Sequence, residues 1–222
     1  MEFYEVLEKR RSMRAFHSEP VDQKVIERVF QNALAAPSNC NTQPWYAHVV
    51  SGPQLESLRA LLPEKFMAGE IELDFPYDGV YEGEFKDRQY ASAQALYDAL
   101  GIERQDKVNR NIAFMRNFTF FDAPHVAFFY LPSGFGIREA CDLGMFAQSV
   151  MLGLVNEGLG SCPQTALGFH AGTLRQALGI ADDRKLMFGL SFGRPLEDAP
   201  VNACRTARAG FDDLIQWHTD LA

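Results

Sequence analysis

The sequence predicts an α+β fold, in which many helices are interspersed with a few short strands. Apolar side chains recur every three or four residues through most of the chain, as they do on one face of a helix. Short apolar runs bounded by proline or glycine are typical of buried strands. With 222 residues, 47% of them apolar, and no internal repeat or linker, the chain fits a single domain, 1–222, with a filled core.

Two helices, a loop and a strand are predicted at the start of the chain. Apolar spacing predicts a short helix over residues 3–10. A second helix follows Asp22 and should end before Pro37, because the residue that precedes a proline is disfavoured in helical geometry. Residues 37–44 are then a polar loop, and residues 47–51 are predicted to form a strand.

The middle of the chain has the weakest pattern. Leucines between residues 55 and 62 predict another short helix. From 64 to 117 acidic and aromatic residues dominate, and apolar periodicity fades. Helices at about 84–99 and 104–117 are predicted there because alanines and leucines return at helical intervals.

Regular patterns return in the second half. Residues 125–131 form an apolar run typical of a buried strand, and small and apolar residues over 140–154 predict a long helix that ends in a glycine cap. A short strand near Gly160 follows. Residues 171–178 are then predicted to form a helix, and residues 186–192 a strand.

Composition excludes several classes of function. The net charge of −8 and the pI of about 5.1 argue against general affinity for nucleic acid or an anionic membrane. The sequence opens with Glu2, Glu5, Glu8 and Lys9 instead of a basic stretch followed by an apolar one, and we expect no apolar segment long enough to span a bilayer. None of Cys40, Cys141, Cys162 and Cys204 forms a C-x-x-C pair, and no histidines stand at zinc-ligand spacing. We therefore expect a cytoplasmic protein with free thiols and no metal site.

Basic side chains cluster near both ends of this acidic chain. Guanidinium groups bind phosphate in bidentate fashion, and a serine hydroxyl adds a donor. Taken alone, the cluster at residues 10–14 is most simply a basic turn exposed to solvent. The second cluster, at residues 205–208, raises the alternative that both bind one monophosphate group. The candidate residues are Arg10, Arg11, Ser12, Arg14, Arg205 and Arg208.

The loop between the second helix and the first strand is rich in amides and hydroxyls. Amides both donate and accept hydrogen bonds, so this loop could bind a polar ligand. A capped turn without a ligand explains the same composition equally well. The candidate residues are Pro37, Ser38, Asn39, Asn41 and Gln43.

A glycine-rich turn follows the long helix at residues 157–166. It is not a dinucleotide fingerprint, because Pro163 stands where G-x-G-x-x-G needs glycine and the strand comes after the glycines. Taken alone, the glycines are most simply a helix terminator. No G-x-S-x-G elbow, phosphate loop or H-E-x-x-H helix is present, so chemistry would have to come from a bound cofactor.

In chain order these segments resemble the nitroreductase family. The resemblance rests on R-R-S-x-R-x-F at 10–16, A-P-S-x-x-N-x-Q-P-W at 36–45 and G-L-G-S-x-P at 158–163. It implies a three-layer sandwich, with a mostly antiparallel sheet flanked by helices, in an intertwined homodimer that holds FMN non-covalently at the subunit interface. Residues 64–117 would be a variable helical or lid insertion, and residues 195–222 a C-terminal extension.

The same resemblance assigns roles to the candidate residues. The basic residues would meet the FMN phosphate and ring edge, and the polar loop would come to the same flavin from the other subunit. A backbone N–H in the glycine-rich turn, which we assign to Thr165, would face flavin N5. Ala166 stands near a place where many relatives have glycine. The cofactor-binding candidates in this turn are Pro163, Gln164, Thr165 and Ala166.

The implied activity is transfer of hydride from NADH or NADPH, through FMN, to a nitroaromatic, a quinone or a similar electron-poor acceptor. Aromatic residues between 66 and 121 could form the wall of the substrate pocket. A role in the core or in dimer contacts explains each of them equally well. The alternatives are a reductive dehalogenase, a flavin-destroying enzyme of the same fold, or a flavin-binding protein without activity. Arg116, Arg138 and Arg194 could bind a 2′-phosphate, but none lies in a motif. The candidate wall residues are Phe75, Tyr77, Tyr81 and Phe85.

Overall fold

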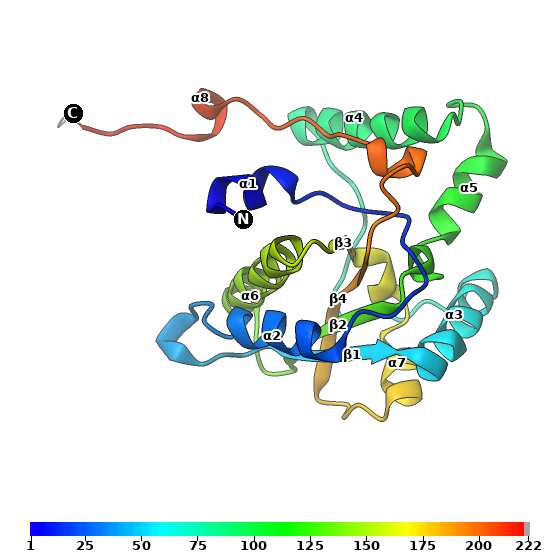
Figure 1. The fold of residues 1–222 in the computed structure, drawn as a ribbon, viewed down its shortest axis with the longest axis vertical. Helices are drawn as coiled ribbons and strands as arrows, with labels where there is room; N and C mark the ends of the chain where they lie inside the picture. The colour runs from blue at the N-terminus through cyan, green and yellow to red at the C-terminus, as the bar shows by residue number, and fades with distance from the viewer. Residues whose placement is uncertain (220–222) are drawn as a thin grey trace.

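A four-stranded sheet forms the centre of the protein (Figure 1). The structure is a computed structural model that describes residues 1–219. The strands lie in the order β1-β2-β4-β3, and all three neighbouring pairs are antiparallel, which confirms the predicted α+β class. The strands are β1 (Tyr46–Ser51), β2 (His125–Pro132), β3 (Gly160–Gln164) and β4 (Arg184–Gly193).

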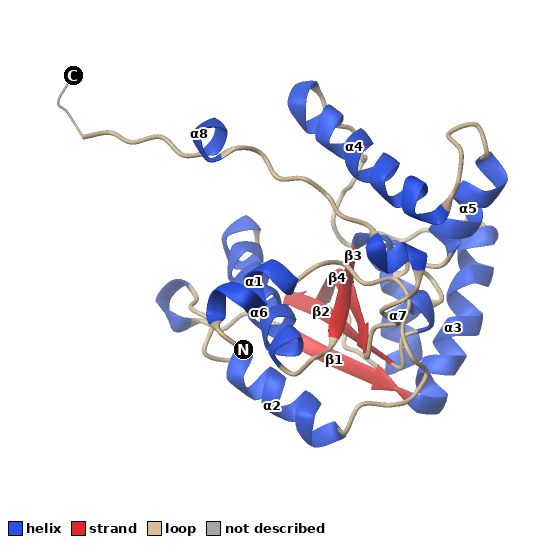
Figure 2. Ribbon diagram, turned by 45° about the horizontal axis from the view of Figure 1, so that its top comes forward, coloured by secondary structure: helices blue, strands red, loops and turns tan. Residues whose placement is uncertain are grey.

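Helices cover both faces of the sheet (Figure 2), as a three-layer sandwich requires. The core on one face joins side chains of α2 and α6 to the sheet, and the core on the other face joins those of α3 and α7. The helices are α1 (Phe3–Lys9), α2 (Gln23–Ala33), α3 (Gly52–Met67), α4 (Gly83–Leu100), α5 (Lys107–Met115), α6 (Ile137–Asn156), α7 (Ala171–Leu178) and α8 (Phe211–Leu214).

Strand β2 supplies side chains to both cores. Successive side chains of a strand point to opposite faces of the sheet. Ala127 and Phe129 accordingly pack with α2 and α6, whereas Val126 and Phe128 pack with α3 and α7. Because both faces of the sheet are covered, this strand is apolar almost throughout. Its sequence therefore shows no alternation of apolar and polar residues.

Helix α3 is the main departure from the predicted elements. The sequence suggested a short helix, but α3 has 16 residues and continues through Pro63. Leu55, Leu58 and Leu62 are almost fully buried on the sheet, and this packing outweighs the backbone hydrogen bond that a proline removes. The short helix α8 was not predicted. By contrast, α7 has the predicted bounds.

The region 64–117 and the C-terminal segment lie at the periphery. Helices α4 and α5 contain no buried residue, and α4 lies beside the one-turn helix η4 (Pro200–Ala203). The chain after η4 runs away from the sheet in an extended path (Figures 1 and 2). In the part of the chain that the structure describes, no helix is both long and apolar enough to cross a membrane.

Candidate functional site

The structure brings the two basic segments together around one cavity of about 330 Å³, which we call the basic cavity. One side comes from the chain that follows α1, and the other from the chain that follows η4. Residues about 190 positions apart in the sequence thus face the same space. The basic cavity is lined by Arg10, Arg11, Ser12, Arg14, Arg205 and Arg208, together with Leu7, Glu8, Cys204 and Thr206.

Backbone hydrogen bonds fix the first basic segment. The N–H of Met13 donates to the carbonyl of Ser161 at 2.9 Å, so this segment lies beside β3. The N–H of Arg14 donates to the side-chain oxygen of Asn202 at 2.7 Å. Asn202 is 1% exposed and was not found by sequence reasoning, since a lone asparagine in a loop gives no signal. It ties the two basic segments to each other.

Positive charge in the basic cavity is poorly compensated. Burial and the neighbouring Arg208 lower the pKa of Arg10, and burial and the neighbouring Arg205 lower that of Arg11. The Nε of Arg11 is buried and has no hydrogen-bond partner within residues 1–219. Glu197, at 3.8 Å from Arg11, is the one described carboxylate paired with these arginines. A multivalent anion is the natural counter-charge for such a site.

The glycine-rich segment 157–166 contains the whole of β3 and the start of the 3₁₀ helix that follows it, and the basic segment lies beside this strand. Pro163 and Thr165 are exposed, whereas Gln164 and Ala166 are buried. The Gln164 amide donates to the carbonyl of Asn117 at 2.8 Å and accepts from the Ser191 hydroxyl, so this side chain holds the fold together. Thr165 begins the 3₁₀ helix η3 (Thr165–Phe169), and the first N–H groups of a helix have no partner within it.

The polar loop has a strained and well-defined shape. Cys40, Asn41 and Gln43 have φ between 47° and 56°, which is costly for residues other than glycine. Hydrogen bonds within the loop hold this shape: the Gln43 N–H donates to the Ser38 hydroxyl at 2.9 Å, and the Gln43 amide donates to the carbonyl of Asn41 at 3.0 Å. The N–H of Asn39 donates to a carboxylate oxygen of the buried Asp142.

The loop does not line the basic cavity of its own chain. It connects α2 to β1 at the opposite end of α2 from the segment that follows α1 (Figure 1). Pro37, Asn39, Asn41 and Gln43 are all exposed there, and Ser38 is half-buried. If these side chains bind the same ligand as the arginines, they must do so from a second copy of the chain.

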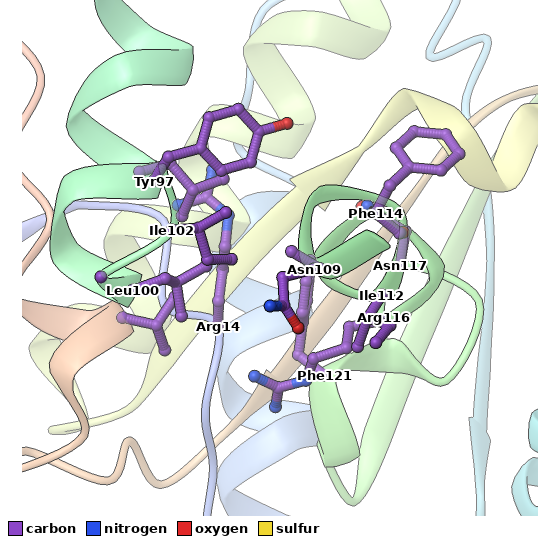
Figure 3. A pocket seen from close by; sticks show the side chains of 14 residues that line it. Arg14, Tyr97, Leu100, Ile102, Asn109, Ile112, Phe114, Arg116, Asn117 and Phe121 are labelled. Carbon is purple, nitrogen blue, oxygen red and sulfur yellow. The ribbon is translucent and has the colours of Figure 1, made fainter. Parts of the chain in front are cut away.

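A second cavity, of about 380 Å³, lies between the end of α4 and α5 (Figure 3), and we call it the apolar cavity. Arg14 lines this cavity as well as the basic one. Its other polar lining includes Asn109, Asn117 and Arg116, which is paired with Asp122 at 3.2 Å. The apolar side chains in its lining are Leu96, Leu100, Ile102, Ile112, Ala113, Phe114, Phe121 and Val201, together with the ring of Tyr97.

The four aromatic residues predicted to wall a substrate lie elsewhere in this single chain. Phe75 packs against the core on the α2 and α6 face, and Tyr77 and Tyr81 are exposed on the loop before α4 and near its start. Phe85 is exposed beneath the guanidinium of Arg88. Their role in substrate binding therefore stays a prediction. Most of the apolar cavity's lining does come from the predicted stretch 66–121, but these residues have ordinary helical spacing and gave no separate signal.

The fold and these cavities define an α+β protein with an arginine-lined cavity next to an apolar one. The chain belongs to the nitroreductase family, whose model matches residues 7–194. This membership confirms the family that the three sequence motifs indicated.

Individual relatives agree with this assignment. The chain is 38% identical over 209 residues to nitroreductase NfnB of Mycolicibacterium smegmatis, covering 94% of this chain and 89% of the relative. It is 31% identical to a 4-nitrobenzoate reductase of Pseudomonas putida over 93% of this chain and 91% of the relative. A crystal structure of the FMN-dependent nitroreductase NfnB from Mycobacterium smegmatis in complex with NADPH superposes with a TM-score of 0.94 at 36% identity, covering 97% of each chain. Similarity to iodotyrosine deiodinase 1 of Rattus norvegicus, at 45% identity, covers 29% of this chain and 23% of the relative.

Proposed function

We propose that this chain is an FMN-dependent oxidoreductase that uses NAD(P)H to reduce nitroaromatic or similarly electron-poor organic molecules. One observation carries the proposal: Arg14 lines both the basic and the apolar cavity. A ligand with a phosphate in the basic cavity and a flat ring whose edge meets Arg14 fits this arrangement, and it leaves the apolar cavity free beside the ring. The family relatives named above, nitroreductase NfnB, known from both its sequence and its crystal structure, and a 4-nitrobenzoate reductase, support the same reaction class.

The residues present fit FMN. The unpartnered Nε of Arg11 and the mutual repulsion of the arginines call for an anion in the basic cavity. Arg10, Arg11 and Ser12, with Arg205 and Arg208, would hold the phosphate, and Arg14 would meet the edge of the ring. Bound FMN would supply the two-electron hydride chemistry, which side chains lack.

Backbone and loop groups would complete the cofactor site. The N–H of Thr165, at the exposed start of η3, would donate a hydrogen bond to the ring nitrogen N5. Pro163, Gln164 and Ala166 would contribute through their backbone, because the side chain of Gln164 is already engaged in the core. The polar loop would reach the same flavin from a second subunit with its preformed amides. These candidates are Pro37, Ser38, Asn39, Asn41 and Gln43.

A homodimer is part of this proposal. Apolar side chains that a monomer would leave in water lie on α1, on α4 and in the C-terminal segment, for example Phe3 at 63%, Phe85 at 59% and Trp217 at 77% exposure. Such unpartnered surfaces are typical of subunit interfaces. Pairing two copies would bury them and would allow the loop of one chain to approach the basic cavity of the other.

The apolar cavity would receive the nicotinamide and the acceptor in turn. Flat, electron-poor rings suit a pocket with aromatic and aliphatic walls and a positive group at its edge. Arg14 would stabilise negative charge that develops on the reduced cofactor, and the aliphatic side chains of α4 and α5 would exclude water. The four residues predicted to wall the substrate, Phe75, Tyr77, Tyr81 and Phe85, do not line this cavity. They could contact a substrate there only if the chain before α4 moved, or if they belonged to the partner subunit.

The decisive experiment is spectroscopic. Purified protein supplemented with FMN and then dialysed should be yellow, anaerobic NADPH or NADH should bleach it, and 4-nitrobenzoate should restore the colour. A colourless preparation would overturn the proposal. Loss of halide from a halotyrosine, with no turnover of nitroarenes, would identify a reductive dehalogenase instead, and failure of every acceptor to restore the colour would identify a flavin-binding protein without activity.

We further propose a reducing, cytoplasmic location. All four cysteines are free, and Cys40 and Cys141 are exposed. Exposed thiols persist where glutathione and thioredoxin keep them reduced.

A further inference from the structure

A third cavity, of about 250 Å³, lies between α4 and the start of α5. Side chains at four positions of α4 form one wall with helical spacing, and two arginines form the other. Tyr97 lines this cavity and the apolar cavity, so the two are neighbours. We call it the arginine–tyrosine cavity, and it is lined by Tyr90, Ala93, Gln94, Tyr97, Arg104 and Arg110.

The two arginines carry positive charge without a carboxylate partner. Among the ion pairs of the described residues, neither Arg104 nor Arg110 takes part, although the chain as a whole is acidic. The Nε of Arg110 is buried and has no hydrogen-bond partner in the described part of the chain. Other arginines nearby are neutralised: Arg88 pairs with Glu84 on the same helix.

The guanidinium of Arg110 is also held in place. It donates a hydrogen bond to the carbonyl of Arg104 at 2.9 Å, and its central carbon lies 5.1 Å from the centre of the Tyr97 ring. A fixed guanidinium loses less conformational entropy when it binds a phosphate than a freely moving one does. The cavity is therefore prepared for an anion attached to an aromatic group.

We infer that Arg104 and Arg110 bind the 2′-phosphate of NADPH, while Tyr90 and Tyr97 contact its adenosine. This inference rests on the proposed function, which places the nicotinamide in the adjoining apolar cavity. NADH lacks the 2′-phosphate and gains nothing from these arginines. The other candidates are less suitable, because Arg116 is engaged by Asp122, and neither Arg138 nor Arg194 lines any of the three cavities.

Binding of a fragment tests the site independently of turnover. Titration calorimetry of the FMN-loaded protein with 2′,5′-ADP and with 5′-AMP should show at least tenfold tighter binding of 2′,5′-ADP. The double variant Arg104→Ala/Arg110→Ala should lose that difference, because each charge-assisted hydrogen bond is worth about tenfold in affinity. Arg88→Ala, on α4 and outside the lining of this cavity, is the matched control and should keep the difference.

Kinetics give the second readout. In the double variant kcat/KM for NADPH should fall by about 100-fold, mainly through KM, while kcat/KM for NADH stays within about twofold. An equal fall with both nucleotides, or retained preference for 2′,5′-ADP over 5′-AMP, would overturn the assignment. A wild-type protein whose flavin neither nucleotide reduces, but which still binds 2′,5′-ADP through these arginines, would contradict the proposed function and leave the phosphate site supported.

Discussion

Asn202 accepts a hydrogen bond from the backbone N–H of Arg14 at 2.7 Å across 188 positions of sequence. Its own amide donates to the carbonyls of Ala15 and Leu196 at 2.8 and 2.9 Å. This one buried side chain therefore joins the segment after α1 to the segment that carries Arg205. The convergence of the two basic segments depends on it more than on any contact between the arginines, which repel one another.

We expect Asn202→Ala to weaken both the fold and the cofactor site. Three backbone groups, one of them buried and two partly buried, would lose their partner, at a cost of roughly 2–4 kcal/mol in the free energy of unfolding. FMN affinity should fall by at least tenfold, because the basic segments would no longer be aligned. Urea unfolding and flavin fluorescence titration measure the two effects. Asn32→Ala, on the exposed face of α2, is the control and should change neither. Unaltered FMN affinity in Asn202→Ala would contradict the alignment role.

Arg14→Ala/Arg208→Ala should release FMN without unfolding the protein. These side chains line the basic cavity, and removal of two like charges relieves repulsion in the protein without cofactor. The flavin-to-protein absorbance ratio after dialysis should fall towards zero, whereas the thermal midpoint of the cofactor-free protein should stay equal or rise. Arg28→Ala, which removes a surface partner of Glu157, serves as the control. Unchanged flavin content would count against the phosphate assignment.

The sequence predicted most of the elements for identifiable physical reasons. The bounds of α7 and the central part of β2 followed from apolar spacing and from the glycine and proline residues beside them. The length of α3 did not, because burial of Leu58 and Leu62 against the sheet, which no local pattern reveals, carries the helix past Pro63. Local helix propensity predicts the end of a helix poorly where tertiary packing determines it.

The site was partly predictable for a similar reason. Two closely spaced groups of arginines stand out in a chain with a net charge of −8, and their meeting around one cavity follows from Asn202 and the edge of β3. The apolar cavity was not predictable residue by residue. Leu96, Leu100 and Ile112 have the spacing of any amphipathic helix, and only the angle between α4 and α5 turns them toward a common space.

Asp74→Ala should destabilise the fold strongly. The Asp74 side chain is 6% exposed, accepts the N–H of Leu186 at 2.7 Å and pairs with Arg175, whose side chain is 16% exposed. Removal of one partner leaves a buried charge uncompensated, which costs about 3–5 kcal/mol. Asp183→Ala breaks a pair with Arg184 in which the Asp183 side chain is 60% exposed, and we expect a loss below about 1 kcal/mol. If urea denaturation gave the same loss of unfolding free energy for Asp74→Ala and Asp183→Ala, the contacts of Asp74 with Arg175 and Leu186 would not stabilise the fold.

His170 should make the fold sensitive to mild acid. It is fully buried between Phe66 and Phe118, and neither ring nitrogen has a hydrogen-bond partner among residues 1–219. Burial lowers its pKa below the ordinary value of 6.5, against the opposing effects of Glu70 and Glu72. The unfolded chain therefore binds a proton that the folded chain rejects, and stability present above pH 6.5 is lost as the pH falls below it.

The variant His170→Phe tests this dependence, because an aromatic ring keeps the packing and removes the titration. The difference in unfolding free energy between pH 7.5 and pH 5.5, from urea denaturation, should be smaller in His170→Phe than in the wild type. His17→Phe, at an exposed position, should leave the difference unchanged. An identical pH dependence in wild type and His170→Phe would exclude His170 as its source.

Mixing two damaged proteins tests whether one flavin site is built from two chains. Arg14→Ala/Arg208→Ala damages the basic cavity, and Asn41→Ala/Gln43→Ala damages the polar loop, so each variant alone should bind little FMN. If the loop serves the partner's cavity, a mixed dimer contains one site with both sets intact and one with neither. After unfolding and refolding together, random pairing should restore about a quarter of the wild-type sites. If both sets came from the same chain, every mixed site would carry one defect and no binding would return. Light scattering on the refolded mixture should give about twice the chain mass of 24.9 kDa, because the complementation requires a dimer.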